Sequence, residues 1–281
     1  MKKKILLLII IVVILFGVVY YFLNNKKIDI GFKVPNYYTI NEINYKDDLS
    51  FYQDIYNWYK KMENDKGVYL INNTYFNKDI INEWKKYSTY QNIPLNDFWY
   101  FTLSPNYLET MNISVDNNYI NDAKNGVRVY LIPNTLKDDE IEKMKLYLQE
   151  VDNRVFTNLA PRKPNETITT KFYESPKTIF VSYTPNKDYF TFPSQDKVSL
   201  IEKAPIIFIC TTNNMTYFES ESLSATGINS YIKFENQEVL DKYKNDLLIN
   251  NKNVTFEKLS NIYKMSERTK LVEKGINYVF E

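Results

Sequence analysis

The chain of 281 residues contains no histidine and a single cysteine, Cys210. Without histidine, the sequence excludes Ser-His-Asp and Cys-His catalysis, HExxH zinc sites and haem held by histidine. A single cysteine excludes an internal disulfide and any metal site built from several cysteines. An enzyme with this composition would therefore depend on carboxylate, lysine or tyrosine chemistry.

Glycine is scarce as well, with six residues, so a glycine-rich loop that cradles phosphate is not indicated. The 35 basic residues nearly balance the 34 acidic ones, and a net charge of +1 gives no reason to expect a nucleic-acid partner. Hydrophobic residues make up 44% of the chain, which is typical of a folded protein. The 25 tyrosines suit an AT-rich genome, and we expect them to fill a core rather than to form sugar-stacking platforms.

The most informative segment is an apolar run from Ile5 to Leu23 that directly follows Lys2–Lys4. As a helix with a rise of about 1.5 Å per residue, it spans roughly 28 Å, close to the thickness of a bilayer core. No small-residue cleavage motif follows, so the run is predicted to be an uncleaved anchor rather than a signal peptide. The lysines place the N-terminus in the cytoplasm, which puts residues 28–281 outside the cell membrane.

Beyond the anchor, amphipathic helices alternate with strands, which predicts an α+β or an α/β fold, and an expected antiparallel hairpin favours α+β. The expected organisation is a membrane anchor over 1–27 followed by a mixed α/β extracytoplasmic region. A Pro- and Asn-containing connection at 157–166 is predicted to divide this region into a first subdomain, 28–156, and a second, 167–281.

Helices are predicted over Asp48–Glu63, Lys78–Tyr87, Gln237–Leu248 and the tail Ser260–Glu281. Strands are predicted over Val68–Tyr75, Phe98–Leu103, Ile168–Tyr173, Thr178–Tyr183, Tyr189–Phe192, Pro205–Thr211 and Ser230–Phe234. The turn residues Pro185–Asp188 predict an antiparallel hairpin of Thr178–Tyr183 with Tyr189–Phe192. The clearest unit is Val127–Glu150, a strand that stops at Pro133 and leads into a helix whose capping box is Thr135–Asp138.

Three features of the sequence could carry chemistry. Asp138–Glu140 could hold a cation or act as an acid–base pair, but the charged first turn of a capped helix explains it more simply. Cys210 is expected to be a buried, inert thiol, because a reactive thiolate needs a basic and exposed setting. The polar stretch after the strand 205–211 is interpreted as an exposed loop and a partner contact. Its contact residues are Glu219, Ser220, Glu221, Ser222, Ser224, Thr226 and Gly227.

Several segments behind the lysine-led anchor carry a resemblance. They are Val129–Pro133, Leu136–Ile141, Lys177–Val181, Pro205–Ile207, Thr212–Met215 and Gly227–Lys233. In this order the chain resembles the extracellular region of the bacteriocin-associated integral membrane proteins of Gram-positive bacteria. These immunity or export proteins are similar in layout to the permeases of macrolide-exporter-type ABC transporters. Such permeases continue into three further membrane helices, so we expect either a truncated or split product or a stand-alone relative with one anchor.

The resemblance implies a non-catalytic role in bacteriocin immunity or export. It implies ABC transporter subunits and a bacteriocin peptide as partners, and it brings no catalytic, cofactor-binding or metal-binding residue. The alternative is a stand-alone module of the cell surface that binds glycan or wall polymer through exposed tyrosine and tryptophan faces. An anchored carboxylate-dependent hydrolase is the weakest hypothesis, because no pair of carboxylates stands out.

Overall fold

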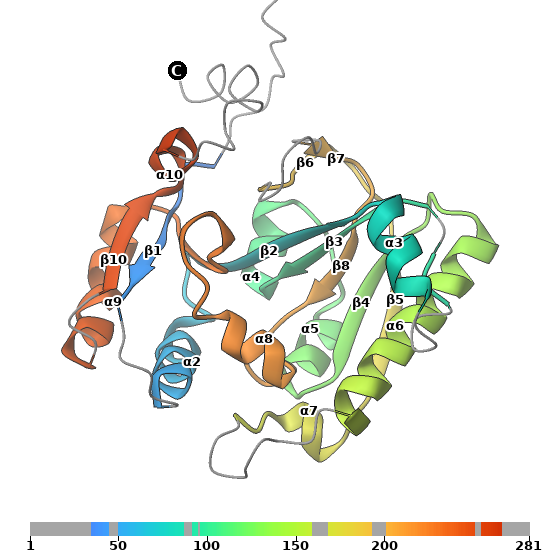
Figure 1. Ribbon diagram of the computed structural model, residues 1–281, viewed down its shortest axis with the longest axis horizontal. Helices are drawn as coiled ribbons and strands as arrows, with labels where there is room; N and C mark the ends of the chain where they lie inside the picture. Colours follow the sequence, from blue (N-terminus) through green and yellow to red (C-terminus); the bar gives the residue numbers. More distant parts are fainter. Residues whose placement is uncertain are drawn as a thin grey trace, which may run out of the picture. The chain divides into compact units, whose positions relative to one another are not determined.

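The computed structural model describes residues 35–44, 50–86, 92–94, 96–158, 168–192, 201–250 and 254–265 (Figure 1). All of them belong to one compact unit, Pro35–Leu271. The mixed α+β architecture that the sequence predicts is confirmed. The predicted anchor Ile5–Leu23 lies outside the described residues, and among the described helices none is long and apolar enough to cross a membrane.

The centre of this unit is a sheet of eight strands in the order β10-β1-β9-β2-β3-β8-β4-β5. Its strands are β1 (Tyr38–Ile43), β2 (Val68–Phe76), β3 (Phe98–Leu103), β4 (Arg128–Pro133), β5 (Thr178–Tyr183), β8 (Ile206–Ile209), β9 (Ile232–Phe234) and β10 (Val254–Lys258). The short strands β6 (Tyr189–Phe190) and β7 (Ile201–Glu202) pair separately. The helices are α2 (Ser50–Met62), α3 (Lys78–Lys85), α4 (Pro105–Thr110), α5 (Asn117–Lys124), α6 (Asp138–Asn158), α7 (Lys171–Glu174), α8 (Tyr217–Ser222), α9 (Gln237–Asn250) and α10 (Leu259–Met265), with a 3-10 turn, η2 (Gly227–Asn229).

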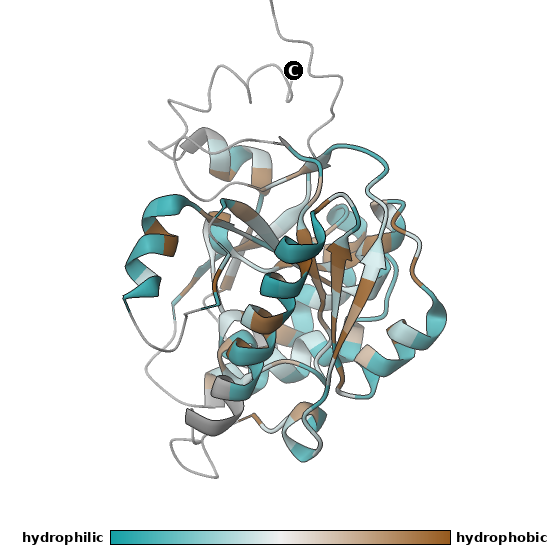
Figure 2. Cartoon of the chain, turned by 90° about the vertical axis from the view of Figure 1, so that its right-hand side faces the viewer, coloured by the Kyte–Doolittle hydropathy of each residue, from teal (hydrophilic) through white to brown (hydrophobic). Residues whose placement is uncertain are grey.

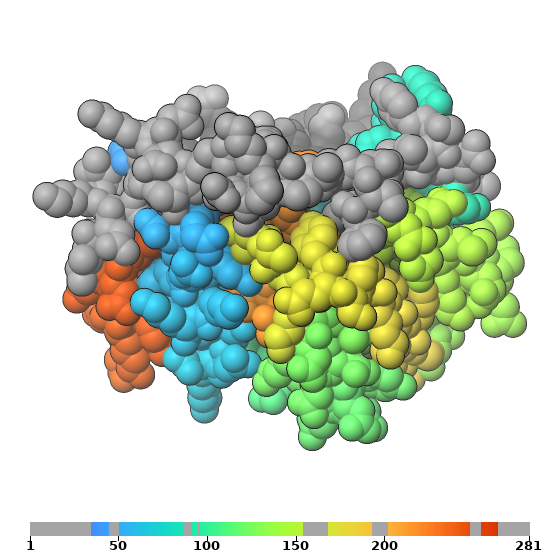
Figure 3. Space-filling model, turned by 90° about the horizontal axis from the view of Figure 1, so that it is seen from below, coloured from blue at the N-terminus to red at the C-terminus, as the bar shows by residue number. Residues whose placement is uncertain are grey.

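One half of the sheet brings together strands from both ends of the described chain. The units β1-α2-β2 and β9-α9-β10 interleave as β10-β1-β9-β2, and every neighbouring pair is antiparallel. This is the arrangement of a ferredoxin-like split β-α-β fold, with residues 77–231 inserted between its two units. Helices α2 and α9 pack against each other. In the view from below, the blue surface of α2 adjoins the orange-red surface of the C-terminal unit (Figure 3).

The inserted residues form the other half of the sheet. β3 runs parallel to β8, β8 antiparallel to β4, and β4 parallel to β5. β4 and β5 belong to different sides of the predicted connection 157–166, yet they are direct neighbours. Described strands from both sides of the predicted connection therefore share one sheet, which consists of a terminal half and an inserted half.

The main core lies on one face of the sheet, where α2, α6 and α9 cover it. Ile40, Leu70 and Phe234 from the terminal half are fully buried there, as are Tyr130 and Phe208 from the inserted half. Tyr130 packs between rings of the neighbouring strands, with centroids 5.8 Å from Phe180 and 5.3 Å from Phe208. Colouring by hydropathy shows the same pattern, with brown, hydrophobic strand segments between helices that are largely teal (Figure 2).

The predicted hairpin is wrong. β5 pairs in parallel with β4 along its whole length, while β6 pairs with β7. The turn between β5 and β6 contacts a different part of the chain instead: Asn186 Nδ2 donates to the Asn112 carbonyl at 2.7 Å. The predicted strand Ile168–Tyr173 is also wrong, since Lys171–Glu174 forms the short helix α7.

Helix starts were predicted with mixed success. The helix predicted to start at Lys78 is confirmed, and Asn77 caps it, because Asn77 Oδ1 accepts from the Ile80 amide at 2.9 Å. The capping box at Thr135–Asp138 is displaced, since α6 begins only at Asp138. The carboxylate that reaches back to the helix start is that of Glu140, which accepts from the Lys137 amide at 3.2 Å. A turn precedes α6, in which the Leu136 amide donates to the Pro133 carbonyl. The helix therefore begins only after this turn.

Candidate functional site

The stretch predicted as an exposed loop is instead a helix followed by a turn. Thr216 caps α8, and its side chain and that of Glu219 satisfy each other's backbone amides as a complete capping box. Ser220 is fully buried and bonds to the Tyr217 carbonyl. The other predicted contact residues are half-buried: Glu219, Glu221, Ser222, Ser224, Thr226 and Gly227. Their contact with a partner stays a prediction.

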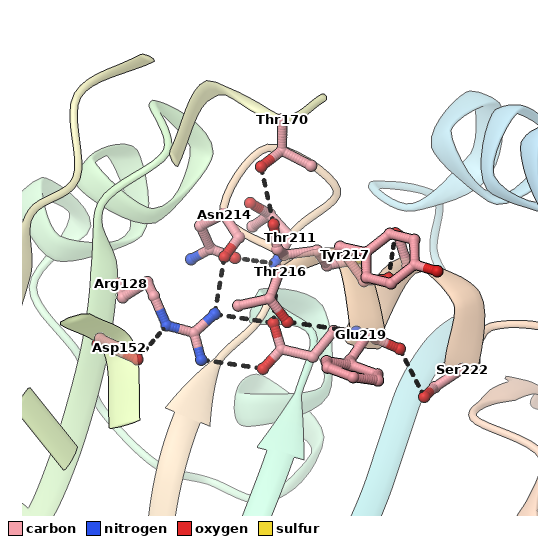
Figure 4. A network of polar contacts seen from close by, with 12 residues as sticks. Arg128, Asp152, Thr170, Thr211, Asn214, Thr216, Tyr217, Glu219 and Ser222 are labelled. Carbon is pink, nitrogen blue, oxygen red and sulfur yellow. Dashed lines mark hydrogen bonds and ion pairs between the residues drawn. The ribbon is translucent and has the colours of Figure 1, made fainter. Parts of the chain in front are cut away.

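Glu219 belongs to a buried ionic network centred on Arg128 (Figure 4). Arg128 is on β4 and 2% exposed. Its Nη1 and Nη2 bind the two carboxylate oxygens of Glu219 at 2.8 and 2.9 Å, and its Nε donates to Asp152 at 2.7 Å. The Tyr130 hydroxyl accepts from Arg128 and donates to Asp152 at 2.8 Å. The network thereby joins β4 to α6 and α8.

The guanidinium is saturated by these contacts. Its remaining Nη1 hydrogen goes to the Asn214 carbonyl at 2.9 Å, so all five N–H donors have acceptors within the chain. The Phe208 ring lies against it, with 4.0 Å between Cζ and the ring centroid. Because no N–H donor of Arg128 is left for a substrate, the network fits a structural role better than a binding or catalytic site.

The two carboxyl groups respond differently to their surroundings. Burial raises the pKa of Asp152 and outweighs the attraction of Arg128. Burial also acts on Glu219, but there the paired Arg128 and the amide and hydroxyl of Thr216 lower the pKa overall. The two hydrogen bonds from Arg128 thus keep Glu219 in its carboxylate form.

A second buried cation lies on β9, on the opposite face from the main core. Lys233 is 1% exposed, and its Nζ donates to the Ser230 carbonyl at 2.6 Å. The Phe192 ring lies 5.5 Å from Nζ, and Tyr69 stands opposite on β2. None of the described ion pairs includes this amine. Burial lowers the pKa of Lys233 to about 7.

Aromatic side chains surround Lys233. Tyr37 stacks on Phe192 with centroids 6.0 Å apart, and Tyr107 packs against Tyr69 at 5.2 Å. Burial raises the pKa of each of these tyrosine hydroxyls, so all three remain neutral at physiological pH. Phe192 has a φ of 43°, a left-handed conformation that is strained for an aromatic residue.

The remaining candidates have structural roles. Asp138–Glu140 forms the acidic first turn of α6, and among the described residues no group of three or more ligating side chains could hold a metal ion. Cys210 is buried, as predicted, and burial raises its thiol pKa, so the thiolate is disfavoured. Glu63 accepts from the Thr212 amide and hydroxyl at 2.8 and 2.7 Å, which ties the end of α2 to the turn after β8.

An open groove of about 570 Å³ runs between α2 and α9. Acidic and basic side chains line it together, among them Asp54, Lys60, Lys61 and Asp246. Trp58 also lines it but is 4% exposed, and its indole N–H is bound to the Tyr243 carbonyl. The groove therefore offers mixed charge and no open aromatic surface.

Comparison of the chain with protein-family models, curated proteins and solved structures finds no match.

Proposed function

We propose that the chain is a membrane-anchored, non-catalytic domain that stands outside the cell membrane and works in bacteriocin immunity or export beside an ABC transporter. The observation that carries the proposal is the apolar run Ile5–Leu23 behind Lys2–Lys4, directly ahead of an α+β domain. Such a run is long enough to span a bilayer core, and its charge bias favours an external domain.

The contacts of the domain support a binding or coupling role. Four of the six segments that carry the family resemblance overlap β4, β5, β8 and β9, while Leu136–Ile141 lies at the start of α6 and Thr212–Met215 between β8 and α8. Arg128, the cation at the centre of the buried ionic network, uses all its donors within the chain. Function then depends on the outer surface and on the anchor.

A protein or peptide partner fits this surface better than a glycan. Sugar-binding surfaces present open aromatic rings, on which the apolar faces of sugars stack. Every tyrosine and tryptophan side chain whose burial is described is buried or half-buried. The large apolar side chains exposed on the described part of the chain are Leu146 and Phe218.

The functional test is deletion of the gene in its own host. We expect the deletion strain to become more sensitive to a bacteriocin, or to export less of it. The full chain should restore the phenotype, whereas a matched secreted form of residues 28–281 should not, because it lacks the anchor. Unchanged sensitivity and export, together with failure to co-purify a transporter subunit, would refute the proposal.

The location is tested with a membrane-impermeant maleimide on intact cells. Ser114 lies at an exposed position between α4 and α5, so Ser114→Cys should be labelled if the domain is outside. The wild-type chain, whose one thiol is the buried Cys210, is the matched control and should stay unlabelled. Labelling of Ser114→Cys only after lysis would place the domain in the cytoplasm.

A further inference from the structure

The two edge strands of the eight-stranded sheet differ in the features that prevent pairing with another chain. The β10 edge carries Glu257 and Lys258, and its pairing with β1 is interrupted by a register shift between Ile40 and Glu42. The β5 edge, Thr178–Tyr183, has no charge and no proline, and it pairs with β4 over six residues without a shift. Edge strands normally carry charge, proline or a bulge to prevent pairing with another chain. β5 lacks all three.

The free side of β5 is defined by its hydrogen bonds to β4. The Lys177 carbonyl accepts from the Arg128 amide and the Tyr183 carbonyl from the Asn134 amide, both at 2.9 Å. Because backbone groups alternate along a strand, the N–H and C=O of the even-numbered residues 178, 180 and 182 point away from β4. Within the described part of the chain, no strand pairs with that side. In Figure 1, β5 lies beyond β4 on the side where α6 packs.

We propose that β5 pairs antiparallel with β5 of a second copy of this chain across a two-fold axis. Hydrogen-bonded positions must then join outward-facing residues of both copies. The register with full overlap places Thr178 opposite Ser182, and Phe180 opposite its own counterpart. The same surface is used by both copies, as a closed two-fold interface requires.

Side-chain pairing favours a second copy as the occupant. In this register Ile179 faces Val181 at the closely spaced, non-hydrogen-bonded positions, a pair of β-branched residues. Ser182 can donate its hydroxyl to Thr178 Oγ1, which itself donates to Asp152 at 2.7 Å, and the two Phe180 rings form an aromatic pair. All three belong to the classes that stabilise antiparallel strands, and no like charges oppose each other. Ser182 is exposed and residues 178–181 are half-buried, so the strand is accessible.

The register is tested by disulfide cross-linking of the full chain in membranes. At non-hydrogen-bonded positions the Cα atoms are about 4.5 Å apart, which a disulfide can bridge. The double variant Ile179→Cys/Val181→Cys should therefore form a covalent dimer on mild oxidation. Ser182→Cys is the matched control, because Thr178 and not a second cysteine faces it. Its dimer yield should be at least tenfold lower.

The assembly itself is tested by light scattering of the full chain in detergent. The wild type should be a dimer and Ser182→Pro a monomer, because proline removes an outward N–H and leaves the β4 ladder intact. A single cooperative urea transition for Ser182→Pro shows that the fold is retained, although its midpoint should fall because the stabilisation by the dimer is lost. A monomeric wild type, a dimer that persists in Ser182→Pro, or cross-linking of the double variant to another protein instead of to itself would overturn the proposal.

Discussion

The burial of Lys233 predicts that this residue destabilises the folded chain, so replacing it with methionine should make the protein more stable. The unfolded chain binds a proton on this lysine with an ordinary pKa of 10.5, and the folded chain with a pKa of about 7. At about 1.4 kcal/mol per pKa unit, this difference amounts to about 5 kcal/mol. The cost is present in full below about pH 7, where the folded state must either bury the charge or give up the proton.

The pH dependence of the stability gained by Lys233→Met shows whether it comes from removing the buried amine or from better packing. Between pH 7 and 10.5 the unfolded state binds more protons than the folded state, so wild-type stability rises with pH. The cost is about 4 kcal/mol at pH 7, where the folded-state amine is half protonated, and about 2 kcal/mol at pH 9, so the advantage of Lys233→Met should shrink by about 2 kcal/mol between pH 7 and pH 9. The tyrosines around Lys233 do not interfere, because burial raises the pKa of each hydroxyl above its ordinary value, which already lies above pH 9.

The assay is urea unfolding followed by tryptophan fluorescence at pH 7 and pH 9. Trp58, Trp84 and Trp99 all lie in the described domain, so they report on its unfolding. The control is Lys258→Met on the edge strand β10, where the lysine is half-exposed and we expect less than about 0.5 kcal/mol of change at both pH values. A Lys233→Met variant that is less stable than wild type at pH 7, or whose advantage is equal at pH 7 and 9, would refute the reasoning.

Three other substitutions or reactions test the packing. Arg128→Met should lower the free energy of unfolding by about 3–5 kcal/mol in urea titrations, because it leaves two carboxylates buried without a cation; no loss would show that the network is neutral. Gly126→Ala should destabilise by more than about 1 kcal/mol in the same assay, since φ is +96° and a Cβ would lie 2.7 Å from Lys171 Cβ; retained stability would contradict this. The Cys210 thiol should react with a thiol reagent only as fast as the chain unfolds, and rapid modification under native conditions would show that it is accessible.

Local pattern was enough to place most elements. β3 occupies the residues predicted for it, because a dense aromatic run is bounded by a polar residue before it and by Ser104-Pro105 after it. The strand-to-helix unit at β4 and α6 follows from an apolar run and a regular helical period. What these patterns do not contain is the partner of each strand. β8 pairs with β3 through residues 106 positions apart in the chain, and with β4 through residues 76 to 80 positions apart.

The site residues had signals that sequence reasoning overlooked. Arg128 and Lys233 each occur within an apolar strand segment, where a charge must find a buried partner or lose its proton. The Thr216-to-Glu219 spacing is a capping box, which predicts a helix where we expected an exposed loop. That Glu219 then binds Arg128, 91 positions away, could not be predicted, because it depends on how α8 packs on the sheet.

The adjacency of β1 and β10 determines how the domain responds to mechanical load. The chain enters and leaves the sheet at one place, where the Leu259 amide bonds to the Tyr37 carbonyl at 2.7 Å and Tyr38 pairs with Lys258. A force that pulls these two ends apart acts on the β1–β10 hydrogen bonds one after another, as in a zipper, and such a geometry yields at low force. A tether at the N-terminal end alone loads none of them. A partner that also pulls on the C-terminal side would peel β10 away first and uncover the edge of β1.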